Sequence, residues 1–329
     1  MTADLFVATV PDSLAGVRVD RAVSMLTGVS RSAAARLVDL GEVVLDGEVV
    51  IDRAAPLRAG SSISVSLASA GDVLAADERV EFRVVFADDA LVVVDKPAGV
   101  VVHPGAGRSD GTLVAGLLAR FPDIGALAGG VCDPARPGIV HRSDKGTSGL
   151  LVVARTPDAY RALASQMQAR TVGREYVALV RGAVPDDRGI VDAPVGRSTR
   201  TPTKMAVSAG GRPARTRYEV DARAERVWRE APGEWIELPV TLVRCVLETG
   251  RTHQIRVHMA AIGHPVVGDD RYGRDRARER GLLVPGRLFL HAASIAVDHP
   301  VTGERLTWRS PLPEDLRQVL DGPRARGTR

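Results

Sequence analysis

Cysteine, lysine and aromatic residues are scarce in this chain of 329 residues, and long apolar runs are missing. The two cysteines, Cys132 and Cys245, stand alone, so the sequence predicts neither a disulfide framework nor a cysteine zinc site. Apolar runs such as 91–94 and 150–154 are too short to cross a bilayer, and residues 1–11 lack the basic start of a secretory signal. We therefore expect a cytoplasmic protein that does not enter a membrane.

Common motifs for nucleotides and metals are also absent. The chain has no GxxxxGK[ST] phosphate loop and no HExxH pair, and residues 105–107 lack the third glycine of a dinucleotide fingerprint. Residues 146–149 do not form a GxSxG nucleophile elbow. His253 and His258 are five positions apart, which on a helix turns them about 140° away from each other. We expect no metal and no small-molecule cofactor.

Basic residues slightly outnumber acidic ones. The 44 lysines and arginines against 40 acids give a net charge of +4, and the isoelectric point is near 9.4. Only three of the basic residues are lysines, at positions 96, 145 and 204, so arginine carries nearly all of the positive charge. A biased codon usage would produce the same excess of arginine over lysine, and we favour that explanation. The charge permits a polyanionic partner without requiring one.

The chain length favours two domains, and local patterns predict the first. Apolar residues repeat at helical spacing from 19 to 26, and a second helix fits 31–40, with Ser30 as its N-cap and Gly41 at its end. Asp46 and Gly47 then give a strong hairpin signal between two short apolar runs. This order of helix, helix and hairpin resembles the S4 RNA-binding domain, so we predict an S4-like domain at residues 14–66.

The rest of the chain alternates between strand-like and helical patterns. Residues 67–80 are rich in small residues and are predicted to be a linker. Residues 81–315 are predicted to form an α+β domain on a large mixed, mainly antiparallel sheet, and 316–329 a flexible basic tail. The predicted strands are 83–86, 91–94, 138–141, 150–154, 176–180 and 240–247, and the predicted helices are 113–120, 157–168 and 253–262.

A polar cluster lies between two of the apolar runs, at residues 141–148. Asp144 stands there beside Arg142, Lys145 and Thr147, surroundings that favour an ionised and hydrogen-bonded carboxylate. Loops held between rigid strands often display reactive groups. Asp is also a common turn residue, so the spacing alone fits either a catalytic carboxylate or a turn.

The same segment resembles a family signature. Residues 141–151, HRSDKGTSGLL, are similar to the signature of the RluA/RluD family of pseudouridine synthases, and this resemblance covers residues 16–313. Ser143 stands where the family usually has Leu, and a small polar residue there would loosen the packing beneath the loop. The HRxD motif followed by TSG favours the large-subunit branch. The further matching segments are 95–107, 174–180, 250–258 and 263–269.

The resemblance implies an isomerase that converts uridine to pseudouridine in RNA without a cofactor, with residues 81–315 as its catalytic domain. It makes Asp144 the catalytic residue, which either attacks C1′ or removes the C2′ proton. Tyr176 would stack on the flipped base and help to remove its C5 proton, although tyrosine in a strand more often belongs to a core. Arg142 would fill the space that the base leaves.

Arg256 falls in the first turns of a predicted helix that has Thr252 as its N-cap and 253–262 as its body. The helix dipole disfavours arginine there, so we expect a nearby acid to compensate it. By resemblance that acid is Asp144, and the ion pair would orient the carboxylate. A solvated arginine is the alternative without the family.

Several regions are candidates for contact with RNA. Residues 193–217 contain six basic residues and no acid, and we interpret them as phosphate-binding rather than as a solvated basic face. Residues 269–280 mix both signs and are interpreted as a solvated insertion loop. The N-terminal domain has equal numbers of arginines and acids from 18 to 58, so any contact there falls to Arg31 and Arg36. The other predicted RNA-binding residues are Arg142, Lys145, Arg197, Arg200 and Lys204.

Taken together, the sequence predicts a monomeric pseudouridine synthase that acts on 23S ribosomal RNA or the pre-ribosomal large subunit. One alternative is a catalytically silent RNA-binding protein for ribosome assembly. The set Asp144, Tyr176 and Arg256 argues against it, because binding alone does not need all three. A synthase for transfer RNA or small-subunit ribosomal RNA is a second alternative and differs only in substrate.

Overall fold

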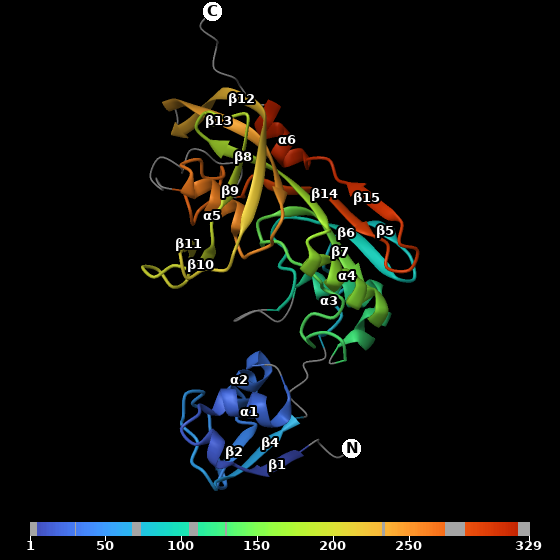
Figure 1. The fold of residues 1–329 in the computed structure, drawn as a ribbon, viewed down its shortest axis with the longest axis vertical. Coiled ribbons are helices and arrows are strands. Elements are labelled where there is room, and N and C mark those ends of the chain that lie inside the picture. The colour runs from blue at the N-terminus through green and yellow to red at the C-terminus, as the bar shows by residue number, and fades with distance from the viewer. Residues whose placement is uncertain are drawn as a thin grey trace, which may run out of the picture. The chain divides into compact units, whose positions relative to one another are not determined.

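The chain divides into two compact units, the first made of residues 1–75 with 133–135 and the second of the remaining residues (Figure 1). The protein is described by a computed structural model that covers residues 5–29, 31–67, 74–104, 111–128, 130–231, 234–273 and 287–321. Each unit has its own buried apolar cluster. The S4-like character of the first unit and the exact domain limits stay predictions.

The first unit is a four-stranded antiparallel sheet with two helices. The helices α1 (Val19–Thr27) and α2 (Arg31–Asp39) form where the apolar spacing predicts them, and α1 ends at Gly28 with a φ of 76°. Asp46 and Gly47 form the expected turn, both with positive φ. The strands are β1 (Leu5–Thr9), β2 (Val43–Leu45), β3 (Glu48–Val49) and β4 (Ser62–Ser66), in the order β1-β4-β2-β3. The strand β1 precedes the predicted domain start at residue 14, and the predicted N-cap Ser30 lies outside the described residues.

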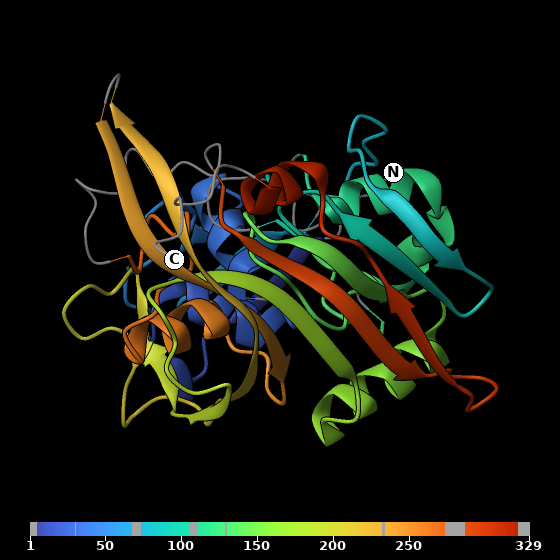
Figure 2. The same ribbon diagram turned by 90° about the horizontal axis from the view of Figure 1, so that it is seen from above.

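The second unit is built on a nine-stranded mixed sheet, as expected. Its order is β5-β6-β7-β14-β8-β13-β12-β9, with β15 paired to β14, and only β7 and β14 pair in parallel among the described strands. Figure 2 shows the twisted sheet with gold β12 and orange-gold β13 at one end and teal β5 and β6 at the other. The strands are β5 (Arg83–Ala87), β6 (Leu91–Lys96), β7 (Ser148–Ala154), β8 (Gly173–Arg181), β9 (Arg188–Asp192), β12 (Arg215–Ala231), β13 (Glu234–Leu247), β14 (Leu290–Asp298) and β15 (Arg305–Arg309).

Helices and one hairpin complete the second unit. The helix α3 (Leu113–Arg120) begins after Thr112 and α4 (Pro157–Ala169) after Thr156, and each threonine hydroxyl accepts a hydrogen bond from the backbone of the first turn. The helix α4 contacts β7 and β14, while α5 (Gln254–Ala261) packs on the cluster around β8 and β13. A separate hairpin consists of β10 (Val195–Arg197) and β11 (Met205–Val207).

Two local predictions were wrong. Residues 138–141 form a loop instead of a strand: only Ile139 pairs with β7, in a single bridge to Val153, and the ring of His141 accepts a hydrogen bond from the backbone N–H of Val152 in β7. The helix α6 (Glu314–Asp321) occupies the start of the predicted flexible tail, and its Leu316 is buried. The linker at 67–80 stays a prediction: the backbone N–H of its Asp77 donates to the carbonyl of Ala115 in α3, and residues 68–73, like the end of the tail, lie outside the described residues.

Candidate active site

Asp144 lies on the loop that precedes β7, and a buried lysine fixes that loop. The Lys96 ammonium, at the end of β6, donates hydrogen bonds to the carbonyl oxygens of Thr147 at 2.6 Å and of Val100 and Pro97 at 2.9 Å each. Burial lowers the pKa of Lys96 to about 7, and the negative charge of Asp144 opposes that shift. The lysine therefore ties the loop of the acid to the segment that follows β6.

Arg256 links Asp144 to a second carboxylate. Its Nε and Nη2 donate to the two oxygens of Asp269 at 2.7 and 2.9 Å, and its Nη1 donates to Asp144 Oδ2 at 3.2 Å. Burial alone would lower the pKa of Arg256, but the hydrogen bonds and charges of the two acids raise it above its usual value. The two-pronged contact with Asp269 holds the guanidinium plane, so Arg256 presents a fixed donor to Asp144.

The turn before α5 places His253 beside the same carboxylate. Its Nε2 lies 3.9 Å from Asp144 Oδ1, and its Nδ1 lies 2.6 Å from the hydroxyl of Tyr272. His253 has a φ of 58° and is itself the residue before the first turn, so the predicted N-cap at Thr252 was wrong. Burial lowers the pKa of His253 below its usual value. Such backbone strain often marks functional sites.

Tyr176 lies on β8 with its ring in the apolar cluster of β8, β13 and α5. It is 6% exposed, and burial raises the pKa of its hydroxyl, with the Asp144 charge raising it further. The structure thus brings the three predicted catalytic residues to one place, from the loop before β7, from β8 and from α5. Asp269 joins them, although the sequence placed it in a solvated loop; it is 2% exposed. Its place in the GHPVVGD segment was the available signal.

Comparison with known proteins decides the family. The family model described as RNA pseudouridylate synthase matches residues 90–261. The chain belongs to this family. Ribosomal large subunit pseudouridine synthase D of Nitrosomonas europaea is 42% identical over 321 residues, 96% of this chain and 87% of the relative. The protein of the same name from Xanthomonas campestris is 41% identical and covers 96% of this chain and 92% of its own.

A solved structure agrees with this assignment. Human RNA pseudouridylate synthase domain containing 1 is 29% identical, with a TM-score of 0.54 over 74% of this chain and 86% of that chain. The expected resemblance to the RluA/RluD family and the expected isomerase class are confirmed. The chain is an RNA pseudouridine synthase.

The predicted RNA-binding residues of the synthase lie in three places. Arg142 and Lys145 flank Asp144 and are exposed. Arg197, Arg200 and Lys204 lie on and between β10 and β11, where Lys204 Nζ donates to the Arg271 carbonyl at 2.6 Å. Met205 of the same hairpin donates its backbone N–H to the Tyr272 hydroxyl, so the hairpin is attached to the site. Arg31 and Arg36 lie on α2, and their side chains are outside the described part of the chain.

Two further arginines of the basic stretch were misinterpreted. The prediction treated Arg215 and Arg217 as basic residues without a counter-charge. Arg217 Nε donates to Glu248 at 2.6 Å, and Arg215 lies 3.7 Å from Glu248 and 3.8 Å from Asp192. Pairing of β12 with β9 and β13 brings these acids close, so local composition could not reveal them.

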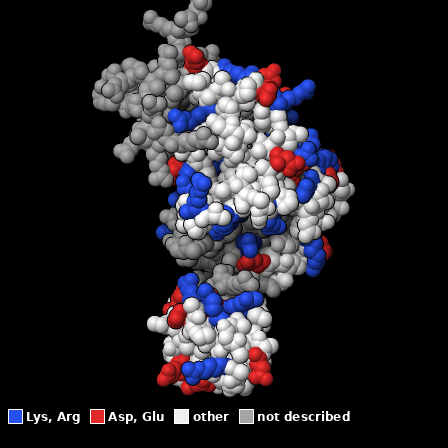
Figure 3. Space-filling view, turned by 60° about the vertical axis from the view of Figure 1, so that its left-hand side comes forward, with Lys and Arg blue, Asp and Glu red and all other residues white. Residues whose placement is uncertain are grey.

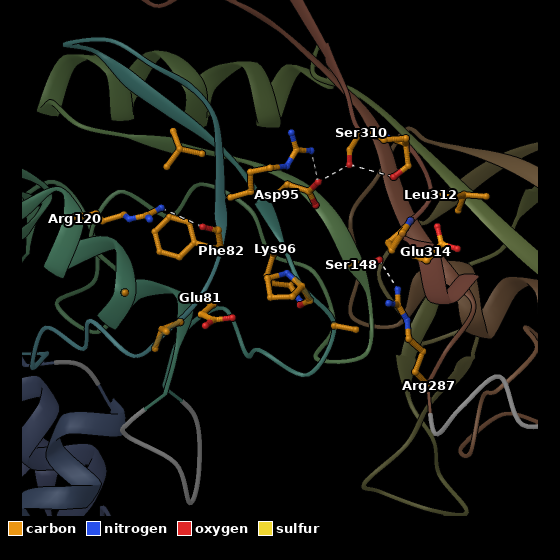
Figure 4. A pocket seen from close by; sticks show the side chains of 18 of the residues that line it. Glu81, Phe82, Asp95, Lys96, Arg120, Ser148, Arg287, Ser310, Leu312 and Glu314 are labelled. Atoms are coloured by element: carbon orange, nitrogen blue, oxygen red, sulfur yellow. Dashed lines mark hydrogen bonds and ion pairs between the residues drawn. The ribbon is translucent and has the colours of Figure 1, made fainter. Parts of the chain in front are cut away.

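A cavity of about 1260 Å³ lies near the site but holds none of its predicted catalytic residues. Figure 4 shows Lys96 and Ser148 in its lining, together with the pairs of Asp95 with Ser310 and Ser148 with Arg287. Lys96 donates a hydrogen bond to Thr147 in the segment that carries Asp144, and Ser148 directly follows that segment. The cavity is therefore lined by residues that contact or adjoin the loop of Asp144, and not by the Asp144 carboxylate itself.

Metal ligands and membrane spans are the remaining features that bear on the site. No group of three or more His, Cys, Asp or Glu side chains in the described ranges is placed to hold a metal ion. Within those ranges, no helix has both the length and the apolar character that a membrane span requires.

Proposed function

We propose that this synthase isomerises uridine to pseudouridine in the ribosomal RNA of the large subunit, with Asp144 as its catalytic carboxylate. The observation that carries the proposal is the arrangement of Asp144, which is 15% exposed and held by an arginine that a second acid fixes. The names of the similar bacterial proteins support the large-subunit substrate. Such an enzyme would work in the cytoplasm.

The reaction breaks the N1–C1′ bond of uridine and makes a C5–C1′ bond, while the C5 proton leaves and N1 gains one. A uridine flipped out of an RNA stem-loop would meet the flat ring of Tyr176. Asp144 would drive the bond cleavage, either at C1′ or through the C2′ proton. Arg256 would keep the carboxylate oriented, and no oxidant or cofactor is needed because the product is an isomer.

A catalytically silent RNA-binding protein is the second candidate. Nothing in RNA binding requires a part-buried carboxylate fixed by a buried arginine and a second acid, and burying such charges is costly. The site supports catalysis for that reason. The β10–β11 hairpin and the loop residues Arg142 and Lys145 would then grip the RNA that delivers the base.

The test is Asp144→Asn, which keeps the shape of the side chain and removes its charge. Pseudouridine formation in a large-subunit ribosomal RNA transcript should fall ~10²-fold or more, while RNA binding stays close to that of the parent. Asp221→Asn is a matched control, because Asp221 also pairs with an arginine, Arg244, but on β12 and β13. Activity of Asp144→Asn within about tenfold of the parent would show that another group drives the cleavage.

A further inference from the structure

A second buried arginine, Arg174, adjoins the site, and its side chain has no partner among the residues that the structure describes. It is 7% exposed, and its side chain makes no hydrogen bond or ion pair with any residue that the structure describes. Its Nε is buried and unsatisfied. Burial lowers the pKa of Arg174, and the nearby Tyr176 hydroxyl opposes the shift only in part. Arginine nevertheless stays protonated in proteins, so Arg174 is a buried charge without a counterion in the described part of the chain.

The position of Arg174 connects it to the reacting base. Arg174 and Tyr176 are two residues apart on β8, so their side chains leave the same face of the sheet. Gly250 leaves the space that the guanidinium occupies, because a Cβ atom at Gly250 would lie 2.5 Å from Arg174 Nη1. The fold thus places a cation next to the tyrosine and keeps a glycine there to admit it.

More arginines surround this position. Arg251 follows Gly250, and its Nε donates to the carbonyl of Pro213, the neighbour of Arg212, at 3.1 Å. Arg170 ends α4 in a left-handed conformation, four residues before Arg174. Burial lowers the pKa of Arg251, and the charges of Arg212, Arg170 and Arg174 lower it further. We call Arg170, Arg174, Arg212 and Arg251 the arginine cluster.

No acid balances the arginine cluster among the described residues. None of its four members forms an ion pair there, although many other arginines of this unit do so. Figure 3 shows several patches of basic side chains on the visible face of the larger unit, with acidic ones scattered between them. A buried charge without a partner costs several kcal/mol, so the fold tolerates Arg174 at the expense of stability.

We propose that the arginine cluster binds a backbone phosphate of the RNA strand, with Arg174 contacting the phosphodiester next to the base that meets Tyr176. The inference rests on the proposed function for the identity of the RNA. A phosphodiester supplies the missing negative charge, and its two free oxygens fit the forked guanidinium donors. Binding there would hold the target nucleotide at a fixed distance from Asp144.

The first experiment compares RNA binding by full-length Arg174→Met and by the parent across a salt titration, with a large-subunit ribosomal RNA fragment as the probe. The slope of log affinity against log salt should fall by about 0.7 to 0.9 if one phosphate is no longer bound. Arg244→Met is the matched control, because Arg244 is already paired with Asp221, and it should keep the parent slope. An unchanged slope and affinity in Arg174→Met would overturn the proposal.

The second experiment separates phosphate binding from a structural role. Arg174→Met should unfold at the same temperature as the parent or higher, because it removes a buried charge that has no partner. A lower unfolding temperature, together with weaker binding, would mean that Arg174 supports the fold instead. Arg174→Lys keeps the positive charge but loses the paired donors of the guanidinium. It should therefore keep the slope of log affinity against log salt and bind RNA with a reduced affinity.

The third experiment locates the phosphate. RNA oligonucleotides that each carry one uncharged methylphosphonate linkage are bound to the parent and to Arg174→Met. One linkage beside the target uridine should weaken binding to the parent and leave binding to the variant unchanged; equal losses in both proteins at every linkage would contradict the proposal. These assays do not read product, so an absence of pseudouridine in the parent would refute the proposed function alone.

Discussion

Arg256 and Arg174 are equally buried, at 7% exposure each, yet their surroundings are opposite. Arg256 contacts Asp144 and Asp269, and its pKa is raised; Arg174 contacts no acid among the described residues, and its pKa is lowered. The first arginine is therefore neutralised by the folded chain itself. The second has no counter-charge among the described residues, and for that reason we propose Arg174 as part of a binding site and Arg256 as an internal support.

The two arginines also differ in what they do for stability. Removing one partner of a buried ion pair lowers the free energy of unfolding strongly, because the other charge stays buried without compensation. A buried charge without a partner already lowers the free energy of unfolding, so replacing it by an apolar residue should raise that free energy. Proteins keep such unfavourable groups where function requires them.

The largest expected effect is on the paired arginine. Arg256→Met leaves the carboxylate of Asp269, which is 2% exposed, without its cationic partner. The change should lower the free energy of unfolding by about 3–5 kcal/mol. Pseudouridine formation should fall with it, since Asp144 loses its orienting donor. Urea unfolding of Arg256→Met beside Arg174→Met checks the comparison. The two changes should act in opposite directions, and a similar loss in both would remove the distinction drawn between the two arginines.

Local features of this fold could be predicted from the sequence, whereas the partners of buried charges could not. The helix at 113–120 forms with the bounds that its apolar run predicts, because a local signal, the Thr112 cap, fixes its start. The pairing of Asp144 with Arg256 came from the family resemblance. Charge composition could not reveal the partner Asp269, because a single carboxylate in a mixed-sign segment looks solvated.

Partners from distant strands were the other source of error. Glu248 neutralises Arg217 across the pairing of β12 with β13, whereas residues 193–217 contain no acid of their own. The missing partner of Arg174 is the reverse case. The sequence around Arg174 gave no sign that its side chain would be buried without an acid nearby, because a position in a strand does not tell which charges the sheet will bring close.

A smaller effect is expected where arginines lie at the surface, and it tests the same contrast there. Replacing Arg197, Arg200 and Lys204 by glutamine removes cations that have no acidic partner among the described residues. The salt slope of RNA binding should fall by about 0.7 to 0.9 for each phosphate that the hairpin no longer binds. Replacing Arg215 and Arg217, which Glu248 already pairs, is the control and should change the slope less. The opposite order would show that the hairpin does not face the RNA.

The smallest effect should come from Ser143, next to the catalytic acid. Its Oγ is buried without a hydrogen bond to any described residue, so it resembles Arg174 in lacking a partner but carries no charge. Ser143→Ala should raise the free energy of unfolding by up to about 1 kcal/mol and leave activity near that of the parent, because no hydrogen bond is removed. Ser148→Ala is the matched control: Ser148 bonds to His291 at 2.9 Å and to Arg287 at 2.5 Å, so its removal should destabilise the chain by about 1–3 kcal/mol. Thermal and urea unfolding measure both. If Ser143→Ala instead weakened RNA binding or activity while leaving stability unchanged, the Ser143 hydroxyl would be a substrate contact, as we propose for Arg174, and unpartnered uncharged groups would then also mark the RNA-binding surface.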